Sequence, residues 1–293
     1  MLKKILKRML LGLLALLLLV CVVLGYNYWL NQKFVTTFYD ITTEKPVGQL
    51  RIVELSDLHL REYGEKNEEL IQRIRDLKPD LIMVAGDMDI DTNKNYSVVV
   101  TLMRNLVEIA PVYYAAGNHE WAAIYAYDCP NFGTTMTALG VHWLNPGYED
   151  VTIKGAKLRI GGLFEWPRET LQRENSRKVA DALNNASNNF TNTYTMLICH
   201  CPEVLYTSLK DYEFDLVFSG HTHGGQIRLP GTQGLWSTSQ GLFPKYTAGI
   251  QELGHSQVVI SRGLGDSETI PRIFNEPQLV VVDLTGAPVK ESE

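Results

Sequence analysis

The sequence has few cysteines and no pattern that would use them as a scaffold. Four cysteines occur in 293 residues, and one of them, Cys21, lies in an apolar N-terminal run. The other three are an odd number without a Cys-x-x-Cys spacing, so the sequence predicts neither a disulfide framework nor a zinc ribbon. Charged residues make up 20% and apolar residues 45% of the chain, which excludes a wholly disordered or collagen-like protein.

Positive charge is also scarce beyond the N-terminus. The formal net charge is −6, from 27 Lys and Arg against 33 Asp and Glu, and residues 1–30 hold four of the basic residues and no acid. The rest of the chain therefore carries a net charge of −10. Because proteins bind nucleic acid chiefly by neutralising phosphates with Lys and Arg, no nucleic-acid partner is expected. If this chain acts on phosphates, bound cations must supply the positive charge.

The N-terminus carries an unbroken apolar run at residues 9–25, and an aromatic-rich stretch, Tyr26–Leu30, follows it. As a helix, residues 9–30 extend about 33 Å, enough to cross a hydrocarbon core of about 30 Å. A cleaved signal peptide is the alternative, but no small-x-small cleavage site follows the run. We favour a single-pass anchor in the cell membrane, with the basic residues 3–8 in the cytoplasm and the remaining chain on the outer side.

Short β-branched runs alternate with helical patterns beyond residue 48. Apolar residues fall at helical spacing in 70–77 and 99–106. The runs that predict buried strands are Leu50–Leu55, Leu81–Ala85, Val112–Ala116, Leu158–Leu163, Thr195–Cys199 and Leu216–Ser219. This alternation predicts an α/β sandwich with little or no second domain.

The composition along the chain predicts four segments. They are a basic segment with the anchor (1–30), a polar linker (31–48), one domain (49–285) and a tail (286–293). The Asn-rich stretch 184–192 is predicted to be a solvent-exposed loop.

Residues that carry chemistry follow five of the predicted strands, in turns that contain glycine in three cases. The turns are Ser56-Asp57-Leu58-His59, Gly86-Asp87, Gly117-Asn118-His119-Glu120, Cys199-His200-Cys201 and Gly220-His221-Thr222-His223, and they hold five of the seven histidines. Because strand carboxyl ends converge on one edge of an α/β sheet, we expect these side chains in one cleft. Residues two apart on an extended segment point the same way, so Asp57 with His59, and His221 with His223, should each reach a common centre.

Carboxylate, imidazole and amide ligands together suit Mn, Fe, Zn or a similar divalent ion. The lack of a thiolate set argues against a closed structural zinc site. Because the candidate ligands exceed what one ion needs, we predict two divalent ions that share a carboxylate, an arrangement suited to displacement at phosphorus. The ligand set accepts several metals, so the identity of the ions stays open.

Five motifs follow one another along the chain: Asp57-x-His59, Gly86-Asp87, Gly117-Asn-His-Glu120, His200 and Gly220-His-Thr-His223. In this order they resemble the calcineurin-like metallophosphoesterase family, over about residues 49–285. The heptapeptide Gly220–Gln226, together with the apolar N-terminus, is similar to its membrane-associated bacterial branch. The resemblance implies a four-layer αββα sandwich, with two sheets between helices, preceded here by one transmembrane helix.

The resemblance also implies a role for each motif residue. It implies seven metal ligands: Asp57, His59 and His223 for the first ion, Asn118, His200 and His221 for the second, and Asp87 as the bridge between them. A hydroxide held between the ions would attack phosphorus, and His119, as a catalytic residue, would stabilise or protonate the leaving oxygen.

One position departs from the family pattern. Members often have Gly-Asp-x-x-Asp, in which the second Asp orients the catalytic histidine, whereas this chain has Ile90 there. Asp89 or Asp91 is the candidate to replace it. Without a carboxylate partner, the pKa of His119 and its proton transfer would differ from those of the family.

Several other residues have alternative interpretations. Glu120 is either a first-turn helix acid or a support behind the site. Cys199 and Cys201 are interpreted as buried packing residues rather than ligands, and His142 and His255 as structural histidines. Arg262 and Arg272 either touch a substrate phosphate or are surface charges, and they are left out of the predicted site. For 234–244, we favour an ordinary packed loop over a lip that contacts lipid.

These features predict a membrane-anchored, metal-dependent phosphoric ester hydrolase, phosphodiesterase-like, that cleaves phosphodiester or pyrophosphate bonds. Because the anchor keeps the cleft near the membrane, a lipid or lipid-linked substrate is a sensible class. Two alternatives stay open: a phosphomonoesterase such as a phosphoprotein phosphatase, and a metal-binding surface module without catalysis.

Overall fold

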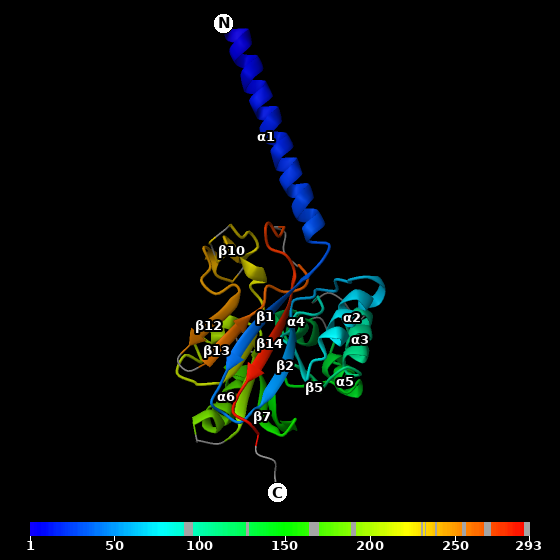
Figure 1. Cartoon of the computed structure of the whole chain (residues 1–293), viewed down its shortest axis with the longest axis vertical. Coiled ribbons are helices and arrows are strands. Elements are labelled where there is room, and N and C mark those ends of the chain that lie inside the picture. The colour runs from blue at the N-terminus through cyan, green and yellow to red at the C-terminus, as the bar shows by residue number, and fades with distance from the viewer. Residues whose placement is uncertain are drawn as a thin grey trace.

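A long helix projects from a folded body in the computed structural model of the chain (Figure 1). The structure describes residues 1–90, 96–126, 129–163, 170–188, 192–229, 231, 233–237, 239–253, 256–266 and 271–289. The helix, α1 (Leu2–Leu30), has a stretch with mean hydropathy 2.8 of which none is buried. Its length and composition fit either a membrane anchor or a signal sequence.

Two six-stranded sheets form the centre of the body. The first has the order β1 (Val35–Thr42), β14 (Gln278–Thr285), β2 (Gln49–Leu55), β3 (Leu81–Val84), β4 (Val112–Tyr114) and β5 (His142–Trp143). The second has the order β12 (Gly249–Leu253), β13 (Ser256–Ile260), β9 (Leu216–Ser219), β8 (Tyr194–Cys199), β7 (Ala156–Leu163) and β6 (Gly147–Ile153). A small hairpin, β10 (Trp236–Ser237) with β11 (Gly241–Leu242), lies outside both sheets.

The helices cover the outer faces of the two sheets. They are α2 (Glu68–Leu77), α3 (Ser97–Leu106), α4 (Asn118–Tyr125), α5 (Phe132–Ala138) and α6 (Thr170–Asn188). On β2, Ile52 packs into the cluster between the sheets with Phe218 of β9, whereas the next residue, Val53, packs outward with Leu70 of α2. Leu183 of α6 belongs to the cluster on the outer face of the second sheet. The alternation of buried faces makes the four layers of the predicted sandwich, and this fold prediction is confirmed.

The sequence predicted six strands, and each is present within a few residues of its expected bounds. Two other expectations are wrong. Residues 31–48 are not only a linker, because they contain β1, which pairs in parallel with β14 near the other end of the chain. The Asn-rich stretch is helical as far as Asn188, in α6, while residues 189–191 lie outside the described part of the chain. In both segments, tertiary pairing overrides the local signal from polar composition.

The strand directions place one edge of the first sheet next to α1. The chain leaves α1 and enters β1, which runs parallel to β14. Because β2 runs antiparallel to β14, β2 and its parallel neighbours β3 and β4 return toward the end of the body where α1 joins (Figure 1). The turns after β2, β3 and β4 therefore lie at the α1 end of the body.

Candidate metal centre

The turns after β2, β3 and β9 hold their site residues in an unusual backbone conformation. Asp57, His59, Asp87, His221 and His223 all have positive φ, between 46° and 70°. The prediction that each Asp-x-His or His-x-His pair lies on an extended segment is therefore wrong, although the side chains do converge. Left-handed backbone costs about 1–2 kcal/mol for a residue with a side chain, and such strain is concentrated at functional sites.

Glycines let these turns approach one another. A Cβ atom on Gly86 would come within 2.3 Å of the backbone nitrogen of Gly117, and one on Gly220 would come within 2.3 Å of a carboxylate oxygen of Asp57. No side chain fits at either position without moving backbone or a site residue. The two glycines thus bring the turns from both sheets into contact.

The ligand atoms converge around two carboxylates. His200 Nε2 lies 3.0 Å from Asp87 Oδ2 and 3.9 Å from Asp57 Oδ1. His223 Nε2 lies 3.6 Å from Asp57 Oδ1 and 3.3 Å from Nε2 of His59. Asp57, His59 and His223 form one group whose ligand atoms all lie within 4.8 Å of one another, and Asp57, Asp87 and His200 form a second. The shared Asp57 makes them one continuous cluster.

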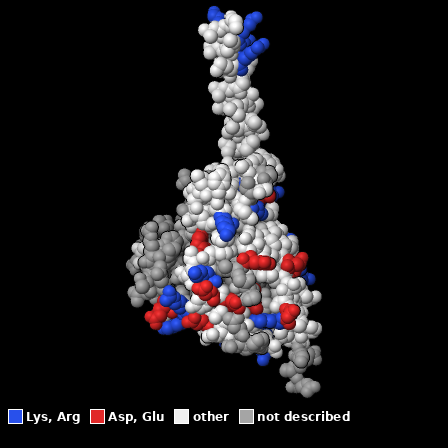
Figure 2. All heavy atoms as spheres, turned by 90° about the vertical axis from the view of Figure 1, so that its left-hand side faces the viewer, with Lys and Arg blue, Asp and Glu red and all other residues white. Residues whose placement is uncertain are grey.

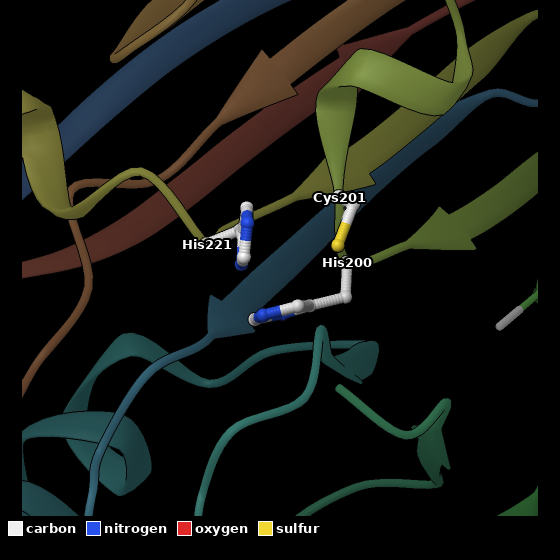
Figure 3. Close-up of side chains that lie close together, drawn as sticks. All are labelled: His200, Cys201 and His221. Atoms are coloured by element: carbon white, nitrogen blue, oxygen red, sulfur yellow. The ribbon is translucent and has the colours of Figure 1, made fainter. Parts of the chain in front are cut away.

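A further group lies on the second sheet, at the ends of β8 and β9. Figure 3 shows the imidazoles of His200 and His221 close together, with Cys201 beside His200. The two ring centroids are 5.1 Å apart, and a sulfur at Cys201 completes a possible three-ligand set. Burial raises the pKa of the Cys201 thiol well above its usual value. Cys201 also belongs to the buried apolar cluster on the outer face of the second sheet, which supports the predicted role in packing.

The donor set fits divalent metal ions. The Oδ1 atom of Asn118, at the start of α4, is buried without a hydrogen-bond partner. A buried amide oxygen without a donor is costly unless another positive group completes its coordination. Together with carboxylate oxygens and imidazole nitrogens, it matches the ligands preferred by Mn, Fe or Zn.

The electrostatics keep most of the imidazoles neutral, which is the form that binds metal. Burial lowers the pKa of His59 to about 3, and it lowers the pKa of His221 to about 4. Burial, with help from His59 and Arg272, also holds the pKa of His223 well below its usual value. All three rings are therefore unprotonated at neutral pH.

His200 behaves in the opposite way. Burial disfavours its charged form, but Asp87 and Asp57 outweigh burial and raise the pKa of His200 to about 10. Burial raises the pKa of Asp57 to about 6, and His200 opposes that rise. Nδ1 of His200 donates to the carbonyl oxygen of Ala85 at 2.6 Å, which directs Nε2 toward Asp87. In the metal-free protein, His200 and Asp87 thus form an ion pair that a cation would replace.

Glu120 supports the turn after β3. Its buried carboxylate accepts hydrogen bonds from the backbone nitrogens of Gly117 (2.8 Å), Asp87 (2.8 Å), Met88 (2.6 Å) and Asp89 (3.2 Å), and from the hydroxyl of Tyr114 (2.7 Å). Both interpretations from sequence are therefore correct, since Glu120 supports the site from behind and also lies in the first turn of α4.

Two residues that sequence reasoning left out support the turn after β9. The buried Arg272 donates to the carbonyl oxygen of Gly265, and Asn275 donates to the carbonyl oxygen of His223 at 2.7 Å. A guanidinium nitrogen of Arg272 also lies 3.1 Å from Nδ1 of His223. Because a guanidinium only donates, Nδ1 accepts here, and metal binding through Nε2 requires this hydrogen bond to break. Arg272 is 2% exposed and is therefore not a surface charge, and no local motif around it signals its role.

The family departure near His119 has a structural context. Asp89 is buried and its backbone is bound by Glu120, Ile90 is half-buried, and Asp91 lies outside the described residues. The ring of His119 lies 4.0 Å from Asp87, through Nε2 and Oδ2. Asp87 is thus one carboxylate near the His119 ring among the residues that the structure describes.

The other two histidines were predicted to be structural. His142 binds Glu149 through Nδ1 at 2.7 Å and stacks on Tyr113, outside the cluster, so this prediction is confirmed. His255 lies outside the described part of the chain.

A two-sheet α/β sandwich with a cluster of carboxylate, imidazole and amide ligands at the strand ends defines a metal-dependent hydrolase. Residues 50–225 match the family model "Calcineurin-like phosphoesterase". The chain belongs to this family and is a metal-dependent phosphoester hydrolase.

Relatives from bacteria span most of the chain. The "Uncharacterized metallophosphoesterase YkuE" of Bacillus subtilis (strain 168) is 29% identical over 89% of this chain and 89% of its own length. The "Phosphodiesterase YaeI" of Escherichia coli (strain K12) is 23% identical over 80% of this chain and 82% of its own length. Among solved structures, TT1561 of Thermus thermophilus is 13% identical over 74% of this chain and 89% of that chain, with a TM-score of 0.48.

Proposed function

We propose that the protein is a membrane-anchored phosphodiesterase or pyrophosphatase that works with two divalent ions. The observation that carries the proposal is the convergence of carboxylates and imidazoles from both sheets, with ligand atoms within 4.8 Å of one another, around Asp57 and Asp87. When bound, such ions neutralise phosphate charge and lower the pKa of an attacking water. The similarity to a relative named as a phosphodiesterase favours diesters over monoesters.

Seven residues are the proposed metal ligands. Asp57, His59 and His223 hold one ion, and this is supported by their position in a single group. Asn118, His200 and His221 hold the other ion, with the unpartnered Oδ1 of Asn118 as support. Asp87 is the proposed bridge between the ions, as the family resemblance implies, and its place in groups with His59 and with His200 supports this role.

His119 is the proposed general acid. Its side chain is 23% exposed, whereas that of Asp87 beside it is 2% exposed, so a substrate can reach the ring of His119 more readily than Asp87. Its backbone nitrogen donates to Asp87 Oδ1 at 2.8 Å, which ties the start of α4 to the bridging carboxylate. In this position the ring can deliver a proton to the leaving oxygen.

The anchor carries the remaining part of the proposal. We infer that residues 1–30 stay attached and span the cell membrane, with the basic N-terminus in the cytoplasm and the domain at 49–285 on the outer side. α1 has 29 residues, or about 44 Å of helix, which exceeds a hydrocarbon core of about 30 Å. A lipid or lipid-linked phosphodiester is the substrate class that suits an enzyme held there.

The test uses the full chain in detergent, stripped of metal and reloaded with Mn, Zn or Mg. We expect hydrolysis of an aryl phosphodiester that requires metal and exceeds hydrolysis of the matching monoester. Asp87→Asn should lower turnover by about 10³-fold, since it removes charge at the centre of the site. Asp283→Asn, in a surface ion pair with Arg51, is the matched control and should retain activity.

The same assay separates the alternatives. Faster monoester hydrolysis would replace the proposal with a phosphomonoesterase. A folded protein that binds metal but turns over neither ester would instead favour the surface module without catalysis.

A further inference from the structure

An exposed apolar surface lies at the α1 end of the domain. We call it the lip and define it by four side chains: Leu229 (46% exposed), Leu242 (70%), Phe243 (75%) and Phe274 (46%). Beyond α1, these are four of the seven large apolar side chains that are exposed among the described residues. The favoured interpretation of 234–244 as a packed loop is therefore wrong at its tip, although Trp236 is half-buried. Gathered apolar side chains on a surface indicate a docking site.

The lip is joined to α1 by a continuous row of hydrogen bonds. The backbone nitrogen of Phe274 donates to Asn27 Oδ1 (2.6 Å), and that of Arg228 donates to the carbonyl oxygen of Ile273 (2.9 Å). Farther along, the nitrogen of Leu235 donates to the carbonyl oxygen of Ile227 (2.8 Å), and that of Phe243 donates to the carbonyl oxygen of Leu235 (2.9 Å). The hairpin of β10 and β11 then pairs Trp236 with Leu242. The lip is thus held beside the last turns of α1.

The aromatic residues of α1 set the depth of this row relative to a bilayer. Asn27, which accepts from Phe274, lies between Tyr26 and Tyr28, two residues before Trp29. Tyr and Trp at the end of a spanning helix occupy the membrane–water interface. Phe274 is therefore held at the level of the lipid headgroups when α1 spans a membrane.

The charge distribution agrees with contact to a bilayer. Figure 1 places β10 at the same end of the body as the base of α1. Figure 2 shows that the part of this face nearest α1 is largely uncharged, whereas Asp, Glu, Lys and Arg gather farther from the helix. Burying the lip in lipid therefore requires little desolvation of charge on this face.

We propose that the lip inserts into the surface of the bilayer that α1 spans. This inference rests on the proposed role of α1 as a membrane anchor. Apolar and aromatic side chains bury favourably at the headgroup boundary, so the lip forms a second contact with the membrane. Two contacts, α1 and the lip, fix the orientation of the domain relative to the bilayer. Because the turn at 223–226 connects directly to the lip segment at 227–229, the metal centre is held at the membrane surface.

The orientation selects a substrate class. The phosphoesters of lipids lie at the headgroup level of the membrane. The lip holds the turn after β9 at this same level. Soluble phosphoesters gain nothing from this contact. We therefore assign to the lip the presentation of a phosphodiester that is part of the bilayer.

The test measures the depth of single labels on the full chain in vesicles of phosphatidylcholine and phosphatidylglycerol. An environment-sensitive fluorophore is attached to one cysteine at a time, and quenching by nitroxide-bearing lipid is compared with quenching by iodide in the water. The native Cys21 reports on α1, because it is exposed while Cys129, Cys199 and Cys201 are buried. Leu242→Cys and the control Thr152→Cys are made in a Cys21→Ala background.

Thr152 is a matched control because it is exposed on β6, next to the turn that leads into the amino end of β7. That end of the second sheet is opposite to the end that bears His200. Neither substitution touches a proposed ligand, and the readout needs no turnover.

We expect lipid quenching at positions 21 and 242 to be several-fold stronger than at 152. Lipid quenching at 21 but not at 242 would overturn the lip and leave the anchor intact, and it would direct the search to a protein that covers the lip. Water-like quenching at 21 would overturn the anchor, and the lip proposal with it. Loss of esterase activity with both labels in lipid would contradict only the proposed chemistry.

Discussion

The turn after β3 and the turn after β9 both carry proposed metal ligands, but side chains of opposite character hold them. The β3 turn is fastened by Glu120, a buried carboxylate that accepts five hydrogen bonds from neighbouring donors. The β9 turn is fastened by Arg272 and Asn275, which donate to carbonyl oxygens. The comparison shows that either sign of buried group can shape a ligand turn, provided that the backbone satisfies it.

The two supports also differ in what lies behind them. Glu120 and Tyr114 belong to the first sheet and the helix that follows it, so this support of the β3 turn lies in the interior of the domain. Arg272 and Asn275 flank Phe274, which binds Asn27 of α1, and Asn31 donates to the carbonyl of Arg272 at 2.9 Å. The support of the β9 turn is therefore bonded directly to α1 and its C-cap, whereas the five hydrogen bonds of Glu120 stay within the first sheet and its turns.

The largest effect is expected from Glu120→Gln. The amide matches the carboxylate in shape but turns one acceptor into a donor that meets backbone N–H groups. Breaking a buried charged network of this kind costs about 3–5 kcal/mol of unfolding free energy, and weakened ligand support lowers metal affinity by about 10–100-fold. Calorimetric unfolding and metal titration check this, with the exposed Glu108→Gln as control. Equal melting and affinity in the two variants would refute the support role.

The metal-free protein should have a stability maximum near neutral pH. In the folded protein, the pKa values of His59 and His221 are about 3 and 4, below the ordinary value near 6.5. Between the folded and the ordinary pKa, the unfolded chain binds more protons than the folded one. The free energy of unfolding therefore falls as the pH drops below about 6.5. His200 has a folded pKa of about 10, so its contribution is complete below about 6.5 and is lost as the pH rises toward 10.

Each such group changes the free energy of unfolding by up to about 1.4 kcal/mol per pH unit within its window. Urea unfolding from pH 4 to 10 in the presence of a chelator measures how the free energy of unfolding falls on the acid side (the acid limb) and on the alkaline side (the alkaline limb) of its maximum. His221→Asn, in the β9 turn, should flatten the acid limb and leave the alkaline limb unchanged. A variant that flattened both limbs alike would show that the histidines do not titrate separately.

A smaller effect is expected from Arg272→Lys. Lysine keeps the charge but lacks the fork that reaches Gly265, Arg262 and His223 together, so the β9 turn loses hydrogen bonds. We expect about a tenfold loss of metal affinity. Arg75→Lys on the exposed face of α2 is the control. Metal titration that gives the same affinity for both variants would remove Arg272 from the support.

The smallest effect is expected from Asn27→Ala, which sharpens the comparison between the turns. It removes the hydrogen bond to Phe274 and should cost about 0.5–1.5 kcal/mol. Asn105→Ala is the control, because its side chain binds Thr101 within α3. Hydrogen exchange should increase in the β9 turn and stay unchanged in the β3 turn. Increased exchange in both turns would contradict the idea that only the support of the β9 turn is bonded directly to α1.

Sequence reasoning singled out the proposed ligands because each follows a buried strand, and strand ends are local features that an apolar run reveals. For the same reason it found six strands, β2, β3, β4, β7, β8 and β9, but it did not predict the other strands of the two sheets. It missed β1, because Val35–Thr42 mixes polar and apolar residues and becomes a strand only by pairing with β14, more than 200 residues away. Arg272 and Asn275 were missed because their contacts with His223 span 49 and 52 residues.

The local geometry was also beyond the sequence. The pairs Asp57 with His59 and His221 with His223 suggested extended segments, but all four residues have left-handed backbone instead. Only the packed structure shows which conformation brings the ligand atoms together.

The connection between α1 and the domain has a mechanical consequence. The chain passes from α1 into β1, which pairs in parallel with β14 from Val35 opposite Gln278 to Thr42 opposite Thr285. A force that draws the folded body away from α1 acts along the axis of β1. It therefore loads this ladder of hydrogen bonds in shear, all together, rather than peeling them apart one by one. The chain thus leaves α1 through a strand pairing that resists tension.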